Sequence, residues 1–141
     1  MYSFERLSDE VHIATSRKHT FGTDALLLSY FAKPKARDIA IDMGTGCGII
    51  PLLWLRKEYP KTVHCLDIQK NAYEQVKCSI EYNGFEERLL PHLCDLRRIH
   101  EQFTAESFTL VTMNPPYKPV GTGIESLDES AKIARHEVCC N

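Results

Sequence analysis

The sequence predicts an α/β protein built on a doubly wound parallel sheet, and three features of the chain predict it. Short apolar stretches of strand length alternate with longer stretches of helical character. A glycine-rich segment, residues 44–48, stands between the first of these strands and the helix after it. Acidic residues or a proline-rich turn follow the strands, at the edge where open parallel sheets bind ligands.

The composition is that of an ordinary globular protein with one domain. Of the 141 residues, 43% are hydrophobic and 26% are charged, which excludes disordered and fibrous proteins. The longest apolar stretches are far shorter than the roughly 20 residues that a membrane-spanning helix needs. Residues 1–10 mix acidic and basic side chains and lack the pattern of an export signal. We therefore expect a cytoplasmic protein without membrane contact.

The six cysteines are expected to be reduced and mostly buried. The chain has no Cys-x-x-Cys pair, and no export signal favours disulfides. Histidine and cysteine at positions 64–65 and 92–94 match no structural zinc pattern, so we expect no bound metal. The cysteines are Cys47, Cys65, Cys78, Cys94, Cys139 and Cys140.

The segment that leads into the sheet, residues 1–37, contains one predicted helix. A turn with a helix cap at Thr23 or Asp24 precedes a short buried helix over residues 25–32, which ends before Pro34.

A strand, a tight loop and a helix come next. Residues 38–42 form the first predicted strand, residues 44–48 the glycine loop and residues 49–59 the helix. Pro51 is acceptable in this helix because it lies in the first turn. The three elements begin a βαβ unit.

The remaining strands continue the alternation. A second strand over residues 61–67 is followed by an amphipathic helix over residues 71–82, which residues 83–84 stop. Residues 89–95 form a third strand and residues 108–113 a fourth. The resulting sheet should be parallel.

The end of the sequence predicts an incomplete domain. Residues 120–128 favour a mobile loop and residues 130–138 a helix, which should lead to a fifth strand. Without that strand the fourth lies at an unpaired sheet edge, so we interpret the chain as the N-terminal portion of one domain. Its parts are a lead-in over residues 1–37, a core over residues 38–117, and a loop with a terminal helix over residues 118–141.

Polar residues follow each strand and should meet in one pocket. Glycines in residues 44–48 allow a ligand to approach the backbone near a helix N-terminus. A dinucleotide-binding loop would have glycine at position 49, where this chain has Ile49, and Asp42 would disfavour a pyrophosphate. An ammonium-bearing ligand suits Asp42 better.

Two further acids are candidates for nucleoside contacts. Asp67, about 20 residues past the glycine loop, is placed to accept hydrogen bonds from ribose hydroxyls. Asp95 can accept from an adenine amino group. The alternative for both is that they cap helices or face water.

The sharpest signal is the tetrapeptide Asn114, Pro115, Pro116 and Tyr117. The prolines stiffen the turn, hold Asn114 in an extended conformation and remove backbone donors. The Asn114 side-chain oxygen and the Pro115 carbonyl can each accept one N–H of a planar amino group, while Tyr117 stacks on the substrate. The alternative is a rigid turn with a surface tyrosine.

Residues 42–48 and 114–117 together resemble class I methyltransferases that modify amino groups, and residues 21–32 and 134–137 are similar to the bacterial valine-tRNA adenine N6-methyltransferases. The resemblance implies a Rossmann-like fold, S-adenosylmethionine as cofactor and a tRNA substrate methylated at adenine-37, with the protein acting as a monomer. The cofactor-binding positions that it implies are Thr23, Asp42, Gly44, Thr45, Gly46, Gly48, Asp67, Ile68, Asp95 and Asn114. The catalytic positions are Asn114, Pro115, Pro116 and Tyr117.

Other functions remain open at this point. The tetrapeptide is shared with adenine DNA methyltransferases and release-factor glutamine methyltransferases, so a protein glutamine N5-methyltransferase is the enzyme alternative. A non-catalytic cofactor-binding fragment and a nicotinamide oxidoreductase are the others. A net charge of −2 gives no global attraction to RNA, so RNA contacts would come from local basic clusters. The candidates are residues 17–19, 33–37 and 97–98, together with Arg135 and His136, which could instead brace the loop at Asn114.

Overall fold

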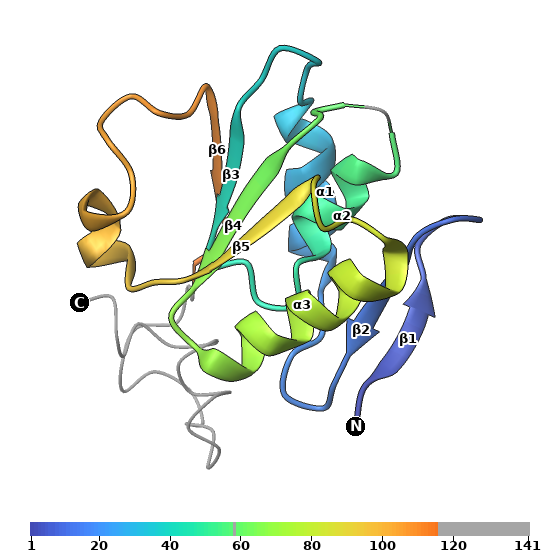
Figure 1. Ribbon diagram of the computed structural model, residues 1–141. Coiled ribbons are helices and arrows are strands. Elements are labelled where there is room, and N and C mark those ends of the chain that lie inside the picture. Colours follow the sequence, from blue (N-terminus) through green and yellow to red (C-terminus); the bar gives the residue numbers. More distant parts are fainter. Residues whose placement is uncertain (58, 116–141) are drawn as a thin grey trace.

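A parallel four-stranded sheet forms the centre of the molecule (Figure 1). The computed structural model describes residues 1–57 and 59–115. The strand order is β5-β4-β3-β6, so the order along the chain reverses at β3. The predicted α/β class with a parallel sheet is therefore confirmed. The strands are β3 (Ala40–Met43), β4 (Val63–Asp67), β5 (Leu89–Leu93) and β6 (Leu110–Met113).

The α-helices of the described residues lie on one side of this sheet, and a short 3₁₀ helix, η1 (Leu96–Glu101), lies on the other (Figure 1). The α-helices are α1 (Thr23–Ala32), α2 (Ile49–Leu55) and α3 (Lys70–Asn83). The main hydrophobic core lies between these helices and the sheet, where Ala40, Val63 and Leu89 are fully buried. Because side chains alternate along a strand, Ile41 and Leu66 point to the other face and pack with Phe103 and Phe108.

A two-stranded antiparallel hairpin, β1 (Ser3–Arg6) and β2 (His12–Thr15), precedes the sheet and was not predicted. Its second strand packs on α3, whose polar side chains bond to the β2 backbone as a neighbouring strand would. The Ala14 amide donates to Ser79 Oγ at 2.8 Å, and the Gln75 amide nitrogen donates to the Ala14 carbonyl at 2.8 Å. The His12 amide donates to Asn83 Oδ1 at 2.8 Å. The lead-in is thereby fixed to the core.

Two expectations for α1 were wrong. The residue at its N-cap is Gly22, which has no side chain to cap the helix, rather than Thr23 or Asp24. The helix is also largely exposed: only Ala25 and Ser29 are buried along it. The sequence of α1 is apolar on all sides, so it does not indicate which face of the helix is buried. In the described part of the chain the helix packs mainly against α2 and β6, and its other faces stay exposed.

Several element boundaries moved as well. Helix α2 ends at Leu55 rather than at residue 59, and the third strand ends at Leu93, because Asp95 begins η1. Helix α3 ends at Asn83, one residue beyond the predicted end, and Gly84 is its left-handed C-cap. Of the four cysteines in the described part, Cys47, Cys65 and Cys94 are buried and all four are free thiols. The predicted loop over residues 120–128 and helix over residues 130–138 lie outside the described residues.

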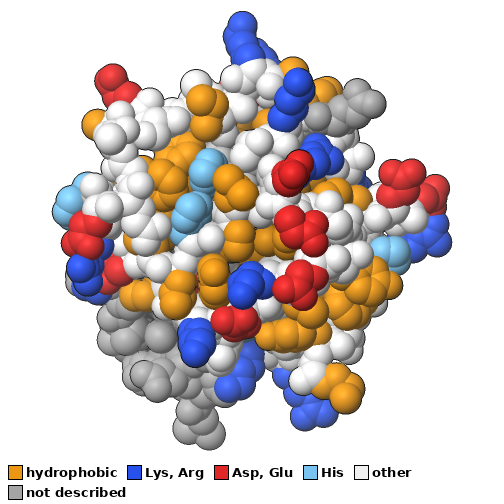
Figure 2. Space-filling model, viewed as in Figure 1, with side chains coloured by type: hydrophobic (Ala, Val, Ile, Leu, Met, Phe, Trp, Pro, Cys, Tyr) orange, Lys and Arg blue, Asp and Glu red, His pale blue; other side chains and the backbone are white. Residues whose placement is uncertain are grey.

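Charges of both signs are mixed over one face of the molecule. Figure 2 shows acidic and basic side chains interspersed over the face in view. Within the described residues, none of the helices is long and apolar enough to cross a membrane.

Candidate active site

A pocket of about 310 Å³ opens where the carboxyl ends of all four parallel strands meet. This is the position beside the reversal of strand order where open α/β sheets bind ligands. The glycine loop, the residues after β4 and β5, and the end of β6 contribute to its walls. Of the residues predicted from the sequence, it brings together Asp42, Gly44, Thr45, Gly46, Asp67, Ile68, Asp95, Asn114 and Pro115.

The glycine loop owes its shape to left-handed backbone at Gly44, Gly46 and Gly48, with φ of 67°, 58° and 82°. Gly46 donates its amide to Asp67 Oδ2 at 2.9 Å, which holds the loop against the end of β4. Gly48 does not line the pocket and has a packing role instead. A Cβ at Gly48 would lie 3.1 Å from a methyl of Val76 on α3.

Asp42 is a buried carboxylate at the floor of the pocket, with 1% of its surface exposed. Its Oδ1 accepts a 2.7 Å hydrogen bond from the hydroxyl of Thr112 on the neighbouring strand. Burial raises the pKa of Asp42 to about 7, although the Thr112 hydrogen bond lowers it. A cation entering the pocket would stabilise the ionised form of this carboxyl.

Asp67 at the end of β4 is held by two backbone amides. Its Oδ1 accepts from the Gln69 amide at 2.9 Å, and its Oδ2 accepts from Gly46. Each carboxylate oxygen has a further lone pair, so Asp67 can still accept from a ligand hydroxyl. Its carboxylate therefore both organises the loop and lines the pocket.

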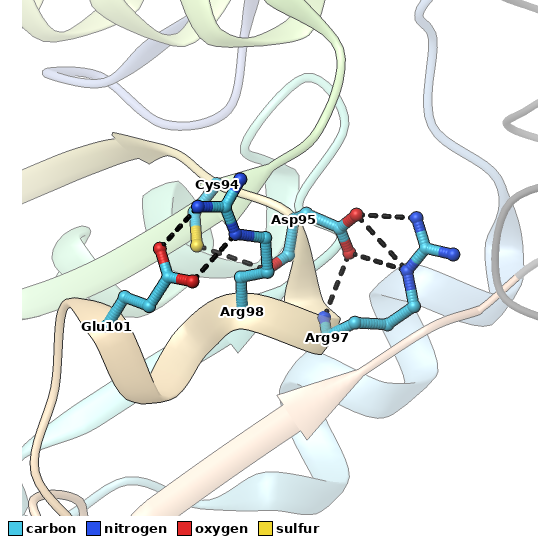
Figure 3. A network of polar contacts seen from close by, with 5 residues as sticks. All are labelled: Cys94, Asp95, Arg97, Arg98 and Glu101. Atoms are coloured by element: carbon cyan, nitrogen blue, oxygen red, sulfur yellow. Dashed lines mark hydrogen bonds and ion pairs between the residues drawn. The ribbon is translucent and has the colours of Figure 1, made fainter.

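Asp95 belongs to a polar network at the start of η1 (Figure 3). Its carboxylate accepts the Arg97 amide at 2.9 Å and pairs with the Arg97 guanidinium at 2.6 Å. The hydrogen bonds from Arg97 lower the pKa of Asp95 to about 2. Farther along, Arg98 pairs with Glu101 at 2.8 Å. Asp95 therefore caps a helix and lines the pocket at once, so the two interpretations of this acid are compatible.

Asn114 and Pro115 line the pocket beside Met113. Pro116 and Tyr117 lie outside the described residues, as do Arg135, His136 and Glu137. Asn114 thus reaches the same pocket as Asp42, from the adjacent strand.

Comparison with known proteins identifies the family. The methyltransferase small domain family matches residues 14–130 of this chain. The chain belongs to the methyltransferase small domain family. The family assignment agrees with the resemblance inferred from the glycine loop and the Asn114 tetrapeptide.

Curated relatives in this family share a name. A tRNA1(Val) (adenine(37)-N6)-methyltransferase of Christiangramia forsetii is 31% identical over 77% of this chain and 47% of its own length. One of Pasteurella multocida is 27% identical over 82% of this chain and 48% of its own length. The chain therefore spans about half the length of the curated relatives that it matches.

Solved structures confirm the fold of the family. The aTrm5 protein, in its complex with tRNALeu, superposes with a TM-score of 0.59 at 20% identity, over 82% of this chain and 33% of that chain. A dimethyladenosine transferase from Plasmodium falciparum gives a TM-score of 0.52 at 26% identity, over 70% and 34%. The Pyrococcus abyssi tRNA (uracil-54, C5)-methyltransferase with S-adenosyl-L-homocysteine gives 0.52 at 21%, over 67% and 24%. The Rossmann-like class I methyltransferase fold inferred from the resemblance is thereby confirmed.

Thr23 does not line the pocket, although the resemblance to the family implied a cofactor contact there. The lead-in contributes other residues, among them Lys18, His19 and Phe21, whose place in this pocket was not predicted. They are placed by Gln75, which is 1% exposed and donates to the His19 carbonyl at 3.0 Å. The one signal of this contact in the sequence was Gln75, a polar residue on the inner face of the predicted amphipathic helix.

His64 and His92, which follow no zinc pattern in the sequence, lie side by side on neighbouring strands. Their rings stack, with His64 Nδ1 and His92 Nε2 3.0 Å apart, against Phe103 on the face of the sheet away from the helices. Burial lowers the pKa of both histidines. In the described part of the chain, no three histidine, cysteine or acidic residues group as metal ligands would.

Proposed function

We propose that this chain carries the active site of an S-adenosylmethionine-dependent methyltransferase that acts on the N6 amine of an adenine in tRNA, namely adenine-37 of valine tRNA. The observation that carries the proposal is the meeting of Asp42 and Asn114 in one pocket. Asp42 stands on β3 and Asn114 directly after β6, on the two strands that flank the reversal of strand order. The names of the curated relatives support the choice of substrate.

The pocket suits S-adenosylmethionine in charge and in shape. Its buried carboxylate, Asp42, would hold the ammonium of the methionine end, while the amides of the glycine loop receive the carboxylate. A side chain at Gly44 or Gly46 would meet no atom of this chain within 4 Å, so it would occupy ligand space instead. Asp67 is proposed for the ribose hydroxyls, with Ile68 and Asp95 at the adenine.

The chemistry requires orientation more than acid–base catalysis. S-adenosylmethionine supplies an electrophilic methyl on a sulfonium. Asn114 Oδ1 and the Pro115 carbonyl would each accept a hydrogen bond from one N–H of the amine, which turns the nitrogen lone pair toward that methyl. A nitrogen–carbon bond forms as the sulfur–carbon bond breaks, and the nitrogen then releases one proton to water.

The remaining assignments follow from this proposal. Pro116 and Tyr117 would complete the amine site, with Tyr117 stacked on an adenine that has left its own stack. We assign the core to residues 38–117, the lead-in to residues 1–37 and the segment after the core to residues 118–141. A tRNA substrate places the protein in the cytoplasm, and we expect a monomer.

Calorimetric titration of the chain tests the cofactor site. S-adenosylmethionine and S-adenosylhomocysteine should bind with micromolar affinity, whereas NAD should not bind. A chain that melts cooperatively and binds neither sulfur compound would contradict the proposal. Binding of NAD would favour an oxidoreductase.

Substrate and catalysis are tested by methyl transfer. Valine tRNA should be methylated, a transcript with guanine at position 37 should not, and a glutamine-bearing peptide should not.

Asn114→Ala should lower turnover roughly 100-fold, the size of effect seen when one group that orients the reacting atoms is removed. Its affinity for S-adenosylmethionine should stay within about two-fold of wild type. Asn71→Ala on the exposed side of α3 is the matched control and should leave turnover unchanged.

A further inference from the structure

A second hollow, of about 740 Å³, lies between α1 and α2. The N-terminal end of α1 contributes Gly22 and Ala25 to the candidate active site, whereas Leu26, Ser29, Tyr30 and the residues after the helix line this hollow. The two pockets therefore lie along one helix, with the hollow extending to its C-terminal end. We call the hollow the basic groove and define it by Tyr30, Lys33, Lys35, Arg56, Lys57 and Tyr59.

The floor of the basic groove is rigid. Trp54 on α2 is 3% exposed, and its indole N–H donates to the Ser29 carbonyl on α1 at 3.0 Å. Arg56 donates to the carbonyls of Leu53 at 3.2 Å and Leu7 at 3.3 Å. The bonds to neutral carbonyls fix the position of Arg56 and leave its positive charge uncompensated.

Among the described residues that line the basic groove, all charges are positive. Four cationic side chains line it, and the described residues that line it include no acid. None of these cations forms an ion pair with a carboxylate of residues 1–57 or 59–115. The chain as a whole carries a net charge of −2, so this positive surface is local. An anionic partner fits it by charge complementarity.

Exposed aromatic rings at the basic groove indicate which class of anionic partner binds there. Tyr30 is 78% exposed and Tyr59 is 41% exposed, although both rings stand at the groove. Tyr30 shares a helix face with Leu26 and Lys33, whereas the exposed Leu27 and Phe31 lie on the adjoining face outside the groove. Aromatic rings set among cations are the arrangement that binds unpaired nucleotides, by base stacking and phosphate contacts.

We propose that the basic groove is a second RNA-binding site, which holds tRNA at a distance from the methylated base. The inference rests on the proposed function, since it concerns the same substrate. Helix α1 has 10 residues and is therefore about 15 Å long, a span that one tRNA arm covers easily. Lys33 and Lys35 contact phosphates, and Tyr30 stacks on an unpaired base.

The test measures binding of a labelled tRNA anticodon arm at several salt concentrations. Lys33→Gln and Lys35→Gln should each reduce the slope of log affinity against log salt by about 1, and together they should weaken binding about ten-fold. Lys77→Gln on α3, where Glu74 already lies 3.9 Å away, is the control and should leave the slope unchanged.

Tyr30→Ser should weaken binding about ten-fold and Tyr30→Phe should restore it, because phenylalanine keeps the stacking face.

Titration of S-adenosylmethionine into the same variants separates this inference from the proposed function. All of them should bind the cofactor as wild type does. The basic groove is not an RNA site if the lysine and Tyr30→Ser variants bind RNA with wild-type affinity and slope, or if wild type binds the cofactor but not the RNA. A wild-type chain that folds and binds neither would overturn both proposals.

Discussion

The Thr112 hydroxyl donates a 2.7 Å hydrogen bond to Asp42 Oδ1. The two residues are register partners on β6 and β3, and Thr112 stands two positions before Asn114. The bond therefore joins the strand that carries the proposed ammonium site to the strand that carries the proposed amine site. This hydrogen bond within the parallel sheet thus connects the proposed cofactor site with the proposed amine site.

Removing the Thr112 hydroxyl should weaken cofactor binding. Thr112→Val keeps the shape of the side chain but leaves Asp42 Oδ1 without its donor, and a hydrogen bond to a charged group stabilises by about 1.5–3 kcal/mol. We expect the affinity for S-adenosylmethionine to fall about ten-fold or more in calorimetry. Thr112→Ser, which restores the hydroxyl, should bind nearly as wild type does. Equal affinities for the Val and Ser variants would show that the bond does not position Asp42.

Cofactor binding should depend on pH through Asp42. The pKa of Asp42 is raised to about 7, so the unliganded chain holds a proton there at lower pH, and an ammonium ligand must displace it. Affinity should therefore rise between about pH 6 and pH 8 and then level off. Proton release can be measured from binding enthalpies in buffers of different ionisation heat. Asp42→Asn should bind weakly with no such release; a wild-type profile in that variant would disprove the assignment.

The same raised pKa predicts how stability changes with pH. An acid whose pKa is higher in the folded state than in the unfolded chain makes the protein less stable as pH rises from the unfolded pKa toward the folded one. For Asp42 this window runs from about 4 to about 7. Thermal denaturation should therefore show Asp42→Asn to be more stable than wild type near pH 7, with a smaller difference near pH 4. A constant difference over that range would rule out the shift.

Gly48→Ala should be more destabilising than Gly46→Ala. Both positions have positive φ, so alanine at either costs about 1–2 kcal/mol of backbone strain. At Gly48 the new Cβ would also lie 3.1 Å from Val76, whereas at Gly46 it would meet nothing within 4 Å. Denaturant unfolding of the two variants measures the difference. Equal losses would mean that α3 yields to the added methyl.

Gln75→Leu should destabilise the protein by about 1–3 kcal/mol, because it leaves the buried carbonyl of Ala14 without its side-chain donor and removes one of the two donors to the His19 carbonyl. It should also weaken cofactor binding, since His19 lines the pocket. Gln102→Leu, at an exposed position, is the control and should change stability by less than about 0.5 kcal/mol. A loss of stability without any loss of affinity would show that the lead-in does not shape the pocket.

Much of the fold and site could be predicted because the relevant signals are local. Each strand is a short apolar run, and Gly84 ends α3 by a rule that operates within one turn. The meeting of Asp42, Asp67 and Asn114 follows from topology, since the carboxyl ends of parallel strands share one edge of the sheet. These predictions did not require knowledge of side-chain packing.

Most of the missed features depend on the tertiary surroundings of a segment. The β1–β2 hairpin is placed by α3 side chains, with 61 positions between Gln75 and Ala14. The exposure of α1 is set by how few neighbours surround it, which its uniformly apolar sequence cannot reveal. The pairing of Asp95 with Arg97 spans two residues, but it requires the chain to turn into η1 at that point.

The place of β3 at the middle of the sheet also constrains the order of folding. Its partner on one side, β4, follows within one βαβ unit, but the bond from Thr112 to Asp42 closes a loop of 70 positions. Such long closures are entropically costly and slow, and a chain emerging from the ribosome has β3, β4 and β5 long before β6. Asp42 therefore acquires its full native surroundings only when β6 joins the sheet, and the nascent chain should acquire affinity for the cofactor only after Thr112 has left the exit tunnel.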